Sequence, residues 1–146
     1  MKLLLDTNVL LLLLVGLLRA DRIGGKRLEK FTSDDFRRVL EWAAEYPKHI
    51  SLPNILTEAS NFLGDSKQEL VKGGQGALAK YIATLEEVYV PSLDVVWGAA
   101  YGAIGLTDAA ILYLADFKIC VVSVDYNLCN RLALEGVEVR NPFNFR

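Results

Sequence analysis

An apolar stretch interrupted by a single carboxylate opens the sequence, and it constrains the fold more than any other feature. Residues 2–10 read KLLLDTNVL. The run at residues 3–5 is apolar at every position, which is typical of a strand covered on both faces, as in a parallel sheet. Asp6 then lies at the carboxyl end of that strand, where open α/β sheets bind their ligands. Thr7 or Asn8 can cap the helix that follows, so a plain helix cap is the alternative interpretation.

The helix expected at residues 8–18 is wholly apolar, so we expect it to be buried between the sheet and other helices. Its residues 9–15 resemble the core of a signal peptide behind Lys2. Asp6 interrupts the apolar stretch, however, and what remains is too short to span a bilayer. We therefore expect neither a signal peptide nor a membrane-spanning segment.

Composition is that of a globular chain. With 146 residues, 52% of them hydrophobic and 23% charged, the chain can bury a substantial core and is not disordered. The formal net charge is −2, so a polyanion has to be met by a local basic patch. Cys120 and Cys129 have neither a CxxC spacing nor a histidine neighbour, which favours reduced core thiols in a cytoplasmic protein. We expect one domain over residues 1–146.

Short apolar runs alternate with helical patterns along the rest of the chain. Further strands are expected at residues 49–52, 88–90, 119–124 and 137–139, and further helices at 34–46, 54–62, 65–87, 94–103, 108–116 and 127–134. Ser33 and Thr107 are the expected caps of two of these helices. Strands that alternate with helices indicate a parallel sheet with helices on both faces. The predicted fold class is therefore α/β.

Four acidic residues stand apart from those on amphipathic helices and in loops. Asp6 and Asp125 each follow a predicted strand. Glu58 lies in a helix soon after a strand, and Asp108 lies at the start of a mostly apolar helix. Strand ends and the helix starts that follow them point to one edge of a parallel sheet, so we expect the four carboxylates to converge there. Taken singly, Asp108 is a helix-start acid and Asp125 a turn former, whereas an unpaired Glu58 in an apolar segment is costly.

Converging carboxylates repel one another, and a divalent cation removes that repulsion. Oxygen ligands select Mg²⁺ or Mn²⁺ over zinc, and the sequence has no Cys/His pairs with ligand spacing. Such a site can activate water and stabilise the charge of in-line attack on a phosphodiester.

Four segments, in this order and spacing, resemble a PIN domain, and together they cover essentially the whole chain. They are LLDTNVL at 4–10, LPNILTE at 52–58, GLTDAAI at 105–111 and VVSVD at 121–125. The resemblance implies a three-layer α/β/α sandwich and a metal-dependent endoribonuclease that uses Mg²⁺ or Mn²⁺ to cleave RNA phosphodiester bonds. By position it assigns Asn8 to orient Asp6 and Ser123 to support the last acid. The catalytic and metal-binding residues that it implies are Asp6, Glu58, Asp108 and Asp125.

The resemblance also implies partners. Many small bacterial and archaeal members are VapC-type toxins neutralised by a cognate antitoxin, and many are dimers, so RNA, an antitoxin and a second copy are the implied partners. The sequence departs from the pattern in two places. Asn127 stands where many members carry a further acid, which argues against a second metal. The segment at residues 19–30 is longer than in the shortest toxins, which makes the toxin assignment weaker than the nuclease one.

We call residues 19–30 the basic loop. RNA that approaches an acidic site needs a positive rim, and the backbone freedom of Gly24-Gly25 would let this loop close over a strand. Two alternatives stay open: a solvated surface loop, and an arm that binds an acidic antitoxin or a second protomer. The residues proposed to contact RNA are Arg19, Arg22, Lys26, Arg27 and Lys30.

Two other classes of function compete with a nuclease. One is a catalytically weak PIN-like scaffold that binds nucleic acid or metal with little turnover. The other is a phosphotransfer enzyme or hydrolase on another doubly wound fold, which requires a second acid two residues after Asp6, where this chain has Asn8. No glycine-rich turn follows the first strand, so a P-loop or dinucleotide site is excluded. His49 is the only histidine and has no credible serine or cysteine partner.

Overall fold

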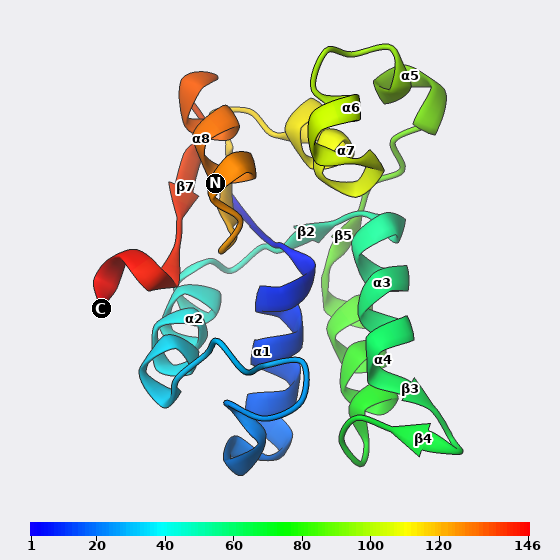
Figure 1. The fold of residues 1–146 in the computed structure, drawn as a ribbon, viewed down its shortest axis with the longest axis vertical. Helices are drawn as coiled ribbons and strands as arrows, with labels where there is room; N and C mark the ends of the chain where they lie inside the picture. Colours follow the sequence, from blue (N-terminus) through cyan, green and yellow to red (C-terminus); the bar gives the residue numbers. More distant parts are fainter.

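Five short parallel strands form the centre of the computed structural model, which describes residues 1–146 (Figure 1). β1 (Lys2–Leu5), β6 (Ile119–Val122) and β7 (Glu138–Arg140) form one sheet in the order β1-β6-β7. β2 (Ile50–Ser51) pairs with β5 (Glu86–Glu87), and a bridge between Leu3 and His49 joins this pair to β1. The parallel strands therefore run in the order β5-β2-β1-β6-β7, with β1 in the middle.

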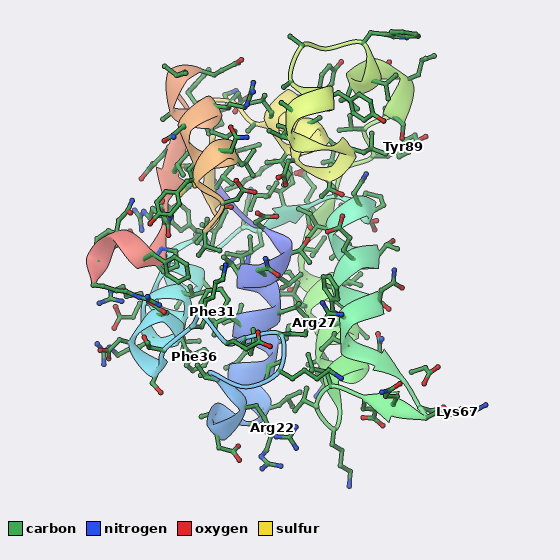
Figure 2. The ribbon with its side chains drawn as sticks, viewed as in Figure 1. Arg22, Arg27, Phe31, Phe36, Lys67 and Tyr89 are labelled. Carbon is green, nitrogen blue, oxygen red and sulfur yellow. The ribbon has the colours of Figure 1, made fainter.

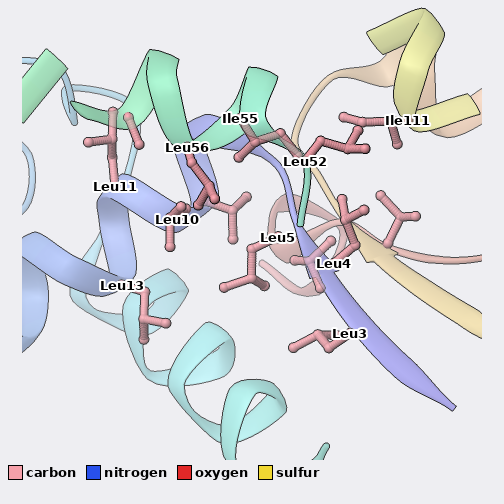
Figure 3. Close-up of a cluster of buried hydrophobic side chains, with 14 of the residues drawn as sticks. Leu3, Leu4, Leu5, Leu10, Leu11, Leu13, Leu52, Ile55, Leu56 and Ile111 are labelled. Atoms are coloured by element: carbon pink, nitrogen blue, oxygen red, sulfur yellow. The ribbon is translucent and has the colours of Figure 1, made fainter. Parts of the chain in front are cut away.

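The opening stretch is buried as predicted. Leu3, Leu4 and Leu5 of β1 are at most 1% exposed. In α1 (Thr7–Leu18), residues 9–15 are all buried, and the helix packs against α2 (Ser33–Glu45), α3 (Pro53–Leu63) and α4 (Gly74–Thr84). Figure 3 shows leucines of β1 and α1 meeting side chains from α3 and α7 (Leu106–Leu114). Each such leucine contributes about 1.5–3 kcal/mol by leaving water.

The other helices complete a mixed α/β fold with eight α-helices, which confirms the predicted class. α5 (Ser92–Val96) and α6 (Tyr101–Ile104) pack on α7, and α8 (Tyr126–Leu134) packs on β7 and α7. One hydrophobic cluster of 34 buried residues draws members from Leu3 through Val137. None of the helices combines the length and the apolar character that crossing a bilayer requires.

The helix predicted over residues 65–87 is wrong at both ends, because α4 covers only Gly74–Thr84 and β5 follows at Glu86–Glu87. β3 (Gly64–Asp65) and β4 (Gln68–Glu69) form an antiparallel hairpin, and α4 begins only at Gly74. Gly64 permits the hairpin because its φ is +85° and a Cβ there would lie 1.9 Å from the carbonyl oxygen of Gln68. Apolar residues keep helical spacing only beyond residue 74, whereas in residues 64–73 backbone conformation, not periodicity, sets the structure.

Three smaller expectations also need correction. The strand expected at residues 88–90 lies at Glu86–Glu87 instead, and after Val88 donates to the Ser51 carbonyl the chain leaves the sheet. The helix expected at residues 94–103 is divided into α5 and α6. Thr32, not Ser33, caps α2, because its hydroxyl accepts from Asp35 N while the Asp35 carboxylate accepts from Thr32 N.

Gly16 lets α1 and α2 approach closely, and this contact can be tested. A Cβ at Gly16 would lie 2.3 Å from the Phe36 ring, whereas a Cβ at Gly76 in α4 meets nothing within 4 Å. We expect Gly16→Ala to lower the free energy of unfolding by about 1–3 kcal/mol through overpacking. Gly76→Ala, the matched control, should raise it by about 0.4–1 kcal/mol. Urea unfolding measures both, and equal stability of the two variants would contradict the packing described.

Candidate functional site

All four predicted carboxylates line a single cavity of about 500 Å³, which we call the acid cavity. Asp6 follows β1 and Asp125 lies just beyond β6, two neighbouring strands. Glu58 projects from α3, and Asp108 comes from the first turn of α7. The structure therefore brings together four acids that lie up to 119 residues apart in the sequence (125 − 6).

Hydrogen bonds from both sides hold Asp6. Its Oδ1 accepts from the backbone N of Thr7 at 2.8 Å, so Asp6 itself caps α1. Its Oδ2 accepts from the hydroxyl of the buried Ser123 at 2.8 Å, and the same hydroxyl oxygen accepts from Asp125 N at 3.1 Å. Asn8 lines the cavity but is not a partner of Asp6. The orienting role expected of Asn8 is thus filled by Thr7 N and Ser123.

Two threonine hydroxyls, which sequence reasoning missed, hold Glu58. Thr7 Oγ1 donates to one carboxylate oxygen at 3.1 Å, and Thr107 Oγ1 donates to the other. Thr107 was expected to cap a helix, but α7 begins at Leu106 and Gly105 occupies the N-cap position. The Thr107 hydroxyl is therefore free to donate to Glu58. Each threonine is the sequence neighbour of a predicted acid, Asp6 or Asp108, and this adjacency is the signal that could have identified them.

The acid cavity concentrates negative charge in a partly buried place. Burial raises the pKa of Asp6, and the charges of Asp125 and Glu58 add to that effect, while hydrogen bonds from Ser123 and Thr7 oppose it. Burial, followed by the charges of Asp6, Asp125 and Glu58, raises the pKa of Asp108 to about 7. Neutral hydroxyls orient these carboxylates without cancelling their charge, so the repulsion among them remains.

Cationic side chains reach the cavity from the basic loop. Arg27 and Lys30 line it, together with Glu29. The Arg27 guanidinium lies 4.4 Å from the centroid of the Phe62 ring on α3, and Figure 2 shows Arg27 on the side of the loop that faces this helix. Arg19 instead forms an exposed ion pair with Asp21 at 2.7 Å, away from the cavity. The structure thus places Arg27 and Lys30 beside the acids and leaves Arg19 out.

Aromatic side chains complete the lining of the cavity, and the sequence pattern did not single them out. They are Phe31, which directly follows the basic loop, Phe62 from α3 and Phe143 from the 3₁₀ helix η2 (Pro142–Phe145). The Phe31 and Phe143 rings pack 5.5 Å apart. An apolar wall beside the acids lowers the local dielectric, which strengthens the electrostatic interactions inside.

The donor chemistry of the cavity suits a hard cation. Its polar lining consists of carboxylates, hydroxyl and amide groups and two cations, with no cysteine or histidine, and such oxygen donors prefer Mg²⁺ or Mn²⁺. Burial first, and then the charges of the neighbouring acids, raise the pKa of Asp108. In the arrangement described, however, no group of three or more acidic, histidine or cysteine side chains is placed so that it could hold an ion.

No family model matches this sequence, and no curated protein matches it significantly.

The charge in the acid cavity predicts how stability depends on pH. The pKa of Asp108 rises from an ordinary 3.8 to about 7 on folding, so the folded chain binds this proton more tightly than the unfolded chain. The free energy of unfolding should therefore fall as pH rises from about 4 to about 7 in EDTA. Asp108→Asn should remove this contribution and raise Tm at pH 8 by at least about 3 °C, the effect of roughly 1 kcal/mol.

Thermal unfolding in EDTA across this pH range measures the effect, and Glu41→Gln, which removes an exposed acid of α2, is the control. If Asp108→Asn and Glu41→Gln follow the same curve as the unmodified chain, Asp108 is not under the charge repulsion inferred.

Proposed function

We propose that this chain is a PIN-like endoribonuclease that depends on Mg²⁺ or Mn²⁺. The observation that carries the proposal is the acid cavity, where four carboxylates from four separate segments meet two cations of the basic loop. A three-layer α/β/α arrangement of PIN type is part of the same proposal. The parallel strand order with β1 in the middle and Asp6 at its carboxyl end supports it, as does the sequence resemblance.

Each residue has a role in this proposal. Asp6, Glu58, Asp108 and Asp125 would hold the ion, which when bound supplies an activated water and stabilises charge on the attacked phosphate. Ser123 and Thr7 fix the orientation of Asp6, and the hydroxyls of Thr7 and Thr107 fix Glu58. Arg27 and Lys30 bind phosphate oxygens of the RNA, because an acidic cavity alone repels a polyanion.

A catalytically weak scaffold that binds nucleic acid is the second candidate. The observation that favours it is the engagement of both Glu58 oxygens by threonine hydroxyls, in an arrangement with no ready set of three ion ligands. The two candidates differ in a single measurable property, which is metal-dependent turnover.

Removal of the Asp6 charge separates these candidates. We expect the unmodified chain to cleave RNA with Mg²⁺ or Mn²⁺ and to stop in EDTA. Asp6→Asn should lower the cleavage rate by at least about 100-fold, since it removes a proposed metal ligand. Metal-free stability should stay equal or rise, because asparagine also caps helices and carries no charge.

Gel analysis of labelled RNA and thermal unfolding provide the two measurements, with Glu41→Gln as the charge-matched control. An unmodified chain that binds RNA but never cleaves it supports the scaffold. A large loss of metal-free stability in Asp6→Asn would mark Asp6 as structural instead.

We propose further that a second copy of the chain covers an apolar groove between α5, α6, α7 and α8. This groove of about 730 Å³ is lined by side chains such as Val95, Leu112 and Tyr113. Beside it, Trp97 at the end of α5 is 85% exposed, and Leu134, which lines it, is 88% exposed. Exposed apolar surface of this kind marks association sites.

Charge complementarity favours a second copy as the occupant of this groove. Its lining includes the acids Asp94 and Glu135 and also the cation Arg131. A twofold axis sets different residues of one patch opposite each other, so a patch carrying both signs can match itself.

Trp97→Ala tests the dimer. Loss of a tryptophan side chain that the dimer interface would bury should raise the dimer Kd by about 30-fold, equivalent to about 2 kcal/mol. Light scattering coupled to size exclusion measures the mass, and Leu17→Ala, which trims an exposed leucine at the end of α1, is the control. A monomeric unmodified chain at high micromolar concentration would contradict the proposal.

The role of toxin in a toxin–antitoxin pair is also a proposal, and the sequence resemblance alone supports it. A small antitoxin gene directly upstream of this one would be the expected neighbour.

A further inference from the structure

A second cavity, of about 430 Å³, adjoins the acid cavity beneath the basic loop. The basic loop, the end of α3 and the β3–β4 hairpin form its walls. Arg27 and Phe62 line both cavities, and no other residue does. These two side chains, stacked 4.4 Å apart, are therefore the shared wall between them.

The two cavities have opposite charge. Arg22, Lys26 and Arg27 line the second cavity, against a single acid, Glu69. The Glu69 carboxylate already accepts a hydrogen bond from Gly73 N at 3.2 Å. The acid cavity carries five carboxylates, those of the four predicted acids and of Glu29, against Arg27 and Lys30. The positively charged second cavity thus directly adjoins the negatively charged acid cavity.

The backbone of Arg27 is held in an unusual conformation at this junction. Arg27 is the only residue other than glycine with a positive φ, +71°. Its N–H donates to the Glu29 carboxylate at 3.0 Å, and the next residue, Leu28, is buried in the core. Strain of this kind persists where the surrounding structure enforces it, and it clusters at ligand sites.

Polar groups and an aromatic ring accompany the cations. Asn61 and Gln68 add amide groups to the lining of the second cavity. Arg22 donates to the Leu70 carbonyl at 3.2 Å, which ties the basic loop to the residue after the hairpin. Basic side chains beside an aromatic face are the combination that binds the phosphate and base of a nucleotide.

We infer that the second cavity binds the nucleotide next to the one held in the acid cavity, with Lys26 and Arg27 on its phosphate. The inference rests on the proposed nuclease function, since it places the flanking nucleotide of the same RNA strand. Arg27 would contact the strand where it passes from one cavity to the other. Neighbouring phosphates of one strand would then meet acids and metal in the first cavity and cations in the second.

The matched pair Lys26→Ala and Lys30→Ala tests this inference, because Lys26 lines only the second cavity and Lys30 only the acid cavity. Binding of a labelled RNA hexamer and of a nucleoside monophosphate is measured in EDTA, so that no cleavage occurs. Lys26→Ala should weaken binding of the hexamer at least about fivefold and lower its log–log salt slope by about 0.7. It should also weaken binding of the monophosphate, because without metal the cationic second cavity attracts phosphate and the acid cavity repels it. Lys30→Ala should weaken binding of the hexamer and leave binding of the monophosphate unchanged.

Arg27→Gly is the second variant, since glycine adopts a positive φ without strain and Tm should not fall. Arg27→Gly should weaken binding of the hexamer more than Lys26→Ala does. Arg37→Ala removes an exposed arginine of α2 and is the control for lost charge. The inference is overturned if Lys26→Ala and Arg27→Gly bind the hexamer as tightly as Arg37→Ala does. It is also overturned if their affinity for an acidic polyglutamate peptide falls as much as their affinity for the hexamer.

Cleavage measured separately keeps this test distinct from the nuclease proposal. If the unmodified chain never cleaves RNA with Mg²⁺ or Mn²⁺, yet the two variants lose hexamer binding as expected, the nuclease proposal fails and the binding site stands. If the chain cleaves RNA and the two variants bind and cleave like Arg37→Ala, the nuclease proposal stands and the second cavity is not a nucleotide site.

Discussion

Burial of β1 and α1 on either side of Asp6 is the constraint on which the rest of the structure depends. Leu5 pairs with Val122 in the parallel ladder, and Asp6 N donates to the Val122 carbonyl at 3.0 Å. Core packing on both flanks fixes the backbone of Asp6, and thereby the place from which its carboxylate projects into the acid cavity. Its hydrogen bonds must therefore come from nearby, and Thr7 N and Ser123 provide them. The ladder that buries the leucines also brings Ser123 and Asp125 to Asp6.

The fold thereby accepts an unfavourable electrostatic arrangement at its centre. A backbone N–H and a hydroxyl donate to Asp6, and two hydroxyls donate to Glu58, yet these neutral donors leave the negative charge in place. Burial, followed by this charge, raises the pKa of Asp108. A fold selected for stability alone would place an apolar or paired side chain at Asp108. Charge repulsion that no neighbouring group relieves is typical of a site whose ligand relieves it. A divalent cation is the ligand whose chemistry matches these oxygens.

The sequence was sufficient where its signals are local, and it failed where the signal is tertiary. The apolar run at residues 3–5 predicts a buried parallel strand because it is apolar at every position and too short for a helix. The positions of Asp6 and Asp125 after strands predict their meeting, because parallel strands share one edge. Thr107 is adjacent to Asp108 in the sequence, but its hydroxyl points to Glu58 on α3, and the adjacency does not report that direction. Gly64 likewise begins a hairpin through its positive φ, which an apolar periodicity on the far side of residue 74 conceals.

Contacts with the rest of the fold hold the cations of the basic loop in place. The sequence suggested an arm free to close over an RNA strand. However, Leu28 within the loop and Phe31 directly after it are 1% and 6% exposed, so these two apolar residues anchor the loop in the core. Gly24 N donates to the Leu28 carbonyl and Leu28 N to the Gly25 carbonyl, which closes a tight turn that contains Arg27. The Lys30 carbonyl accepts from Arg146. Cations fixed in this way lose less conformational entropy on meeting a phosphate than cations on a flexible arm. Fixed placement also keeps Arg27 beside the acids without an ion pair to them, so the negative charge that the proposed metal ion would require is preserved.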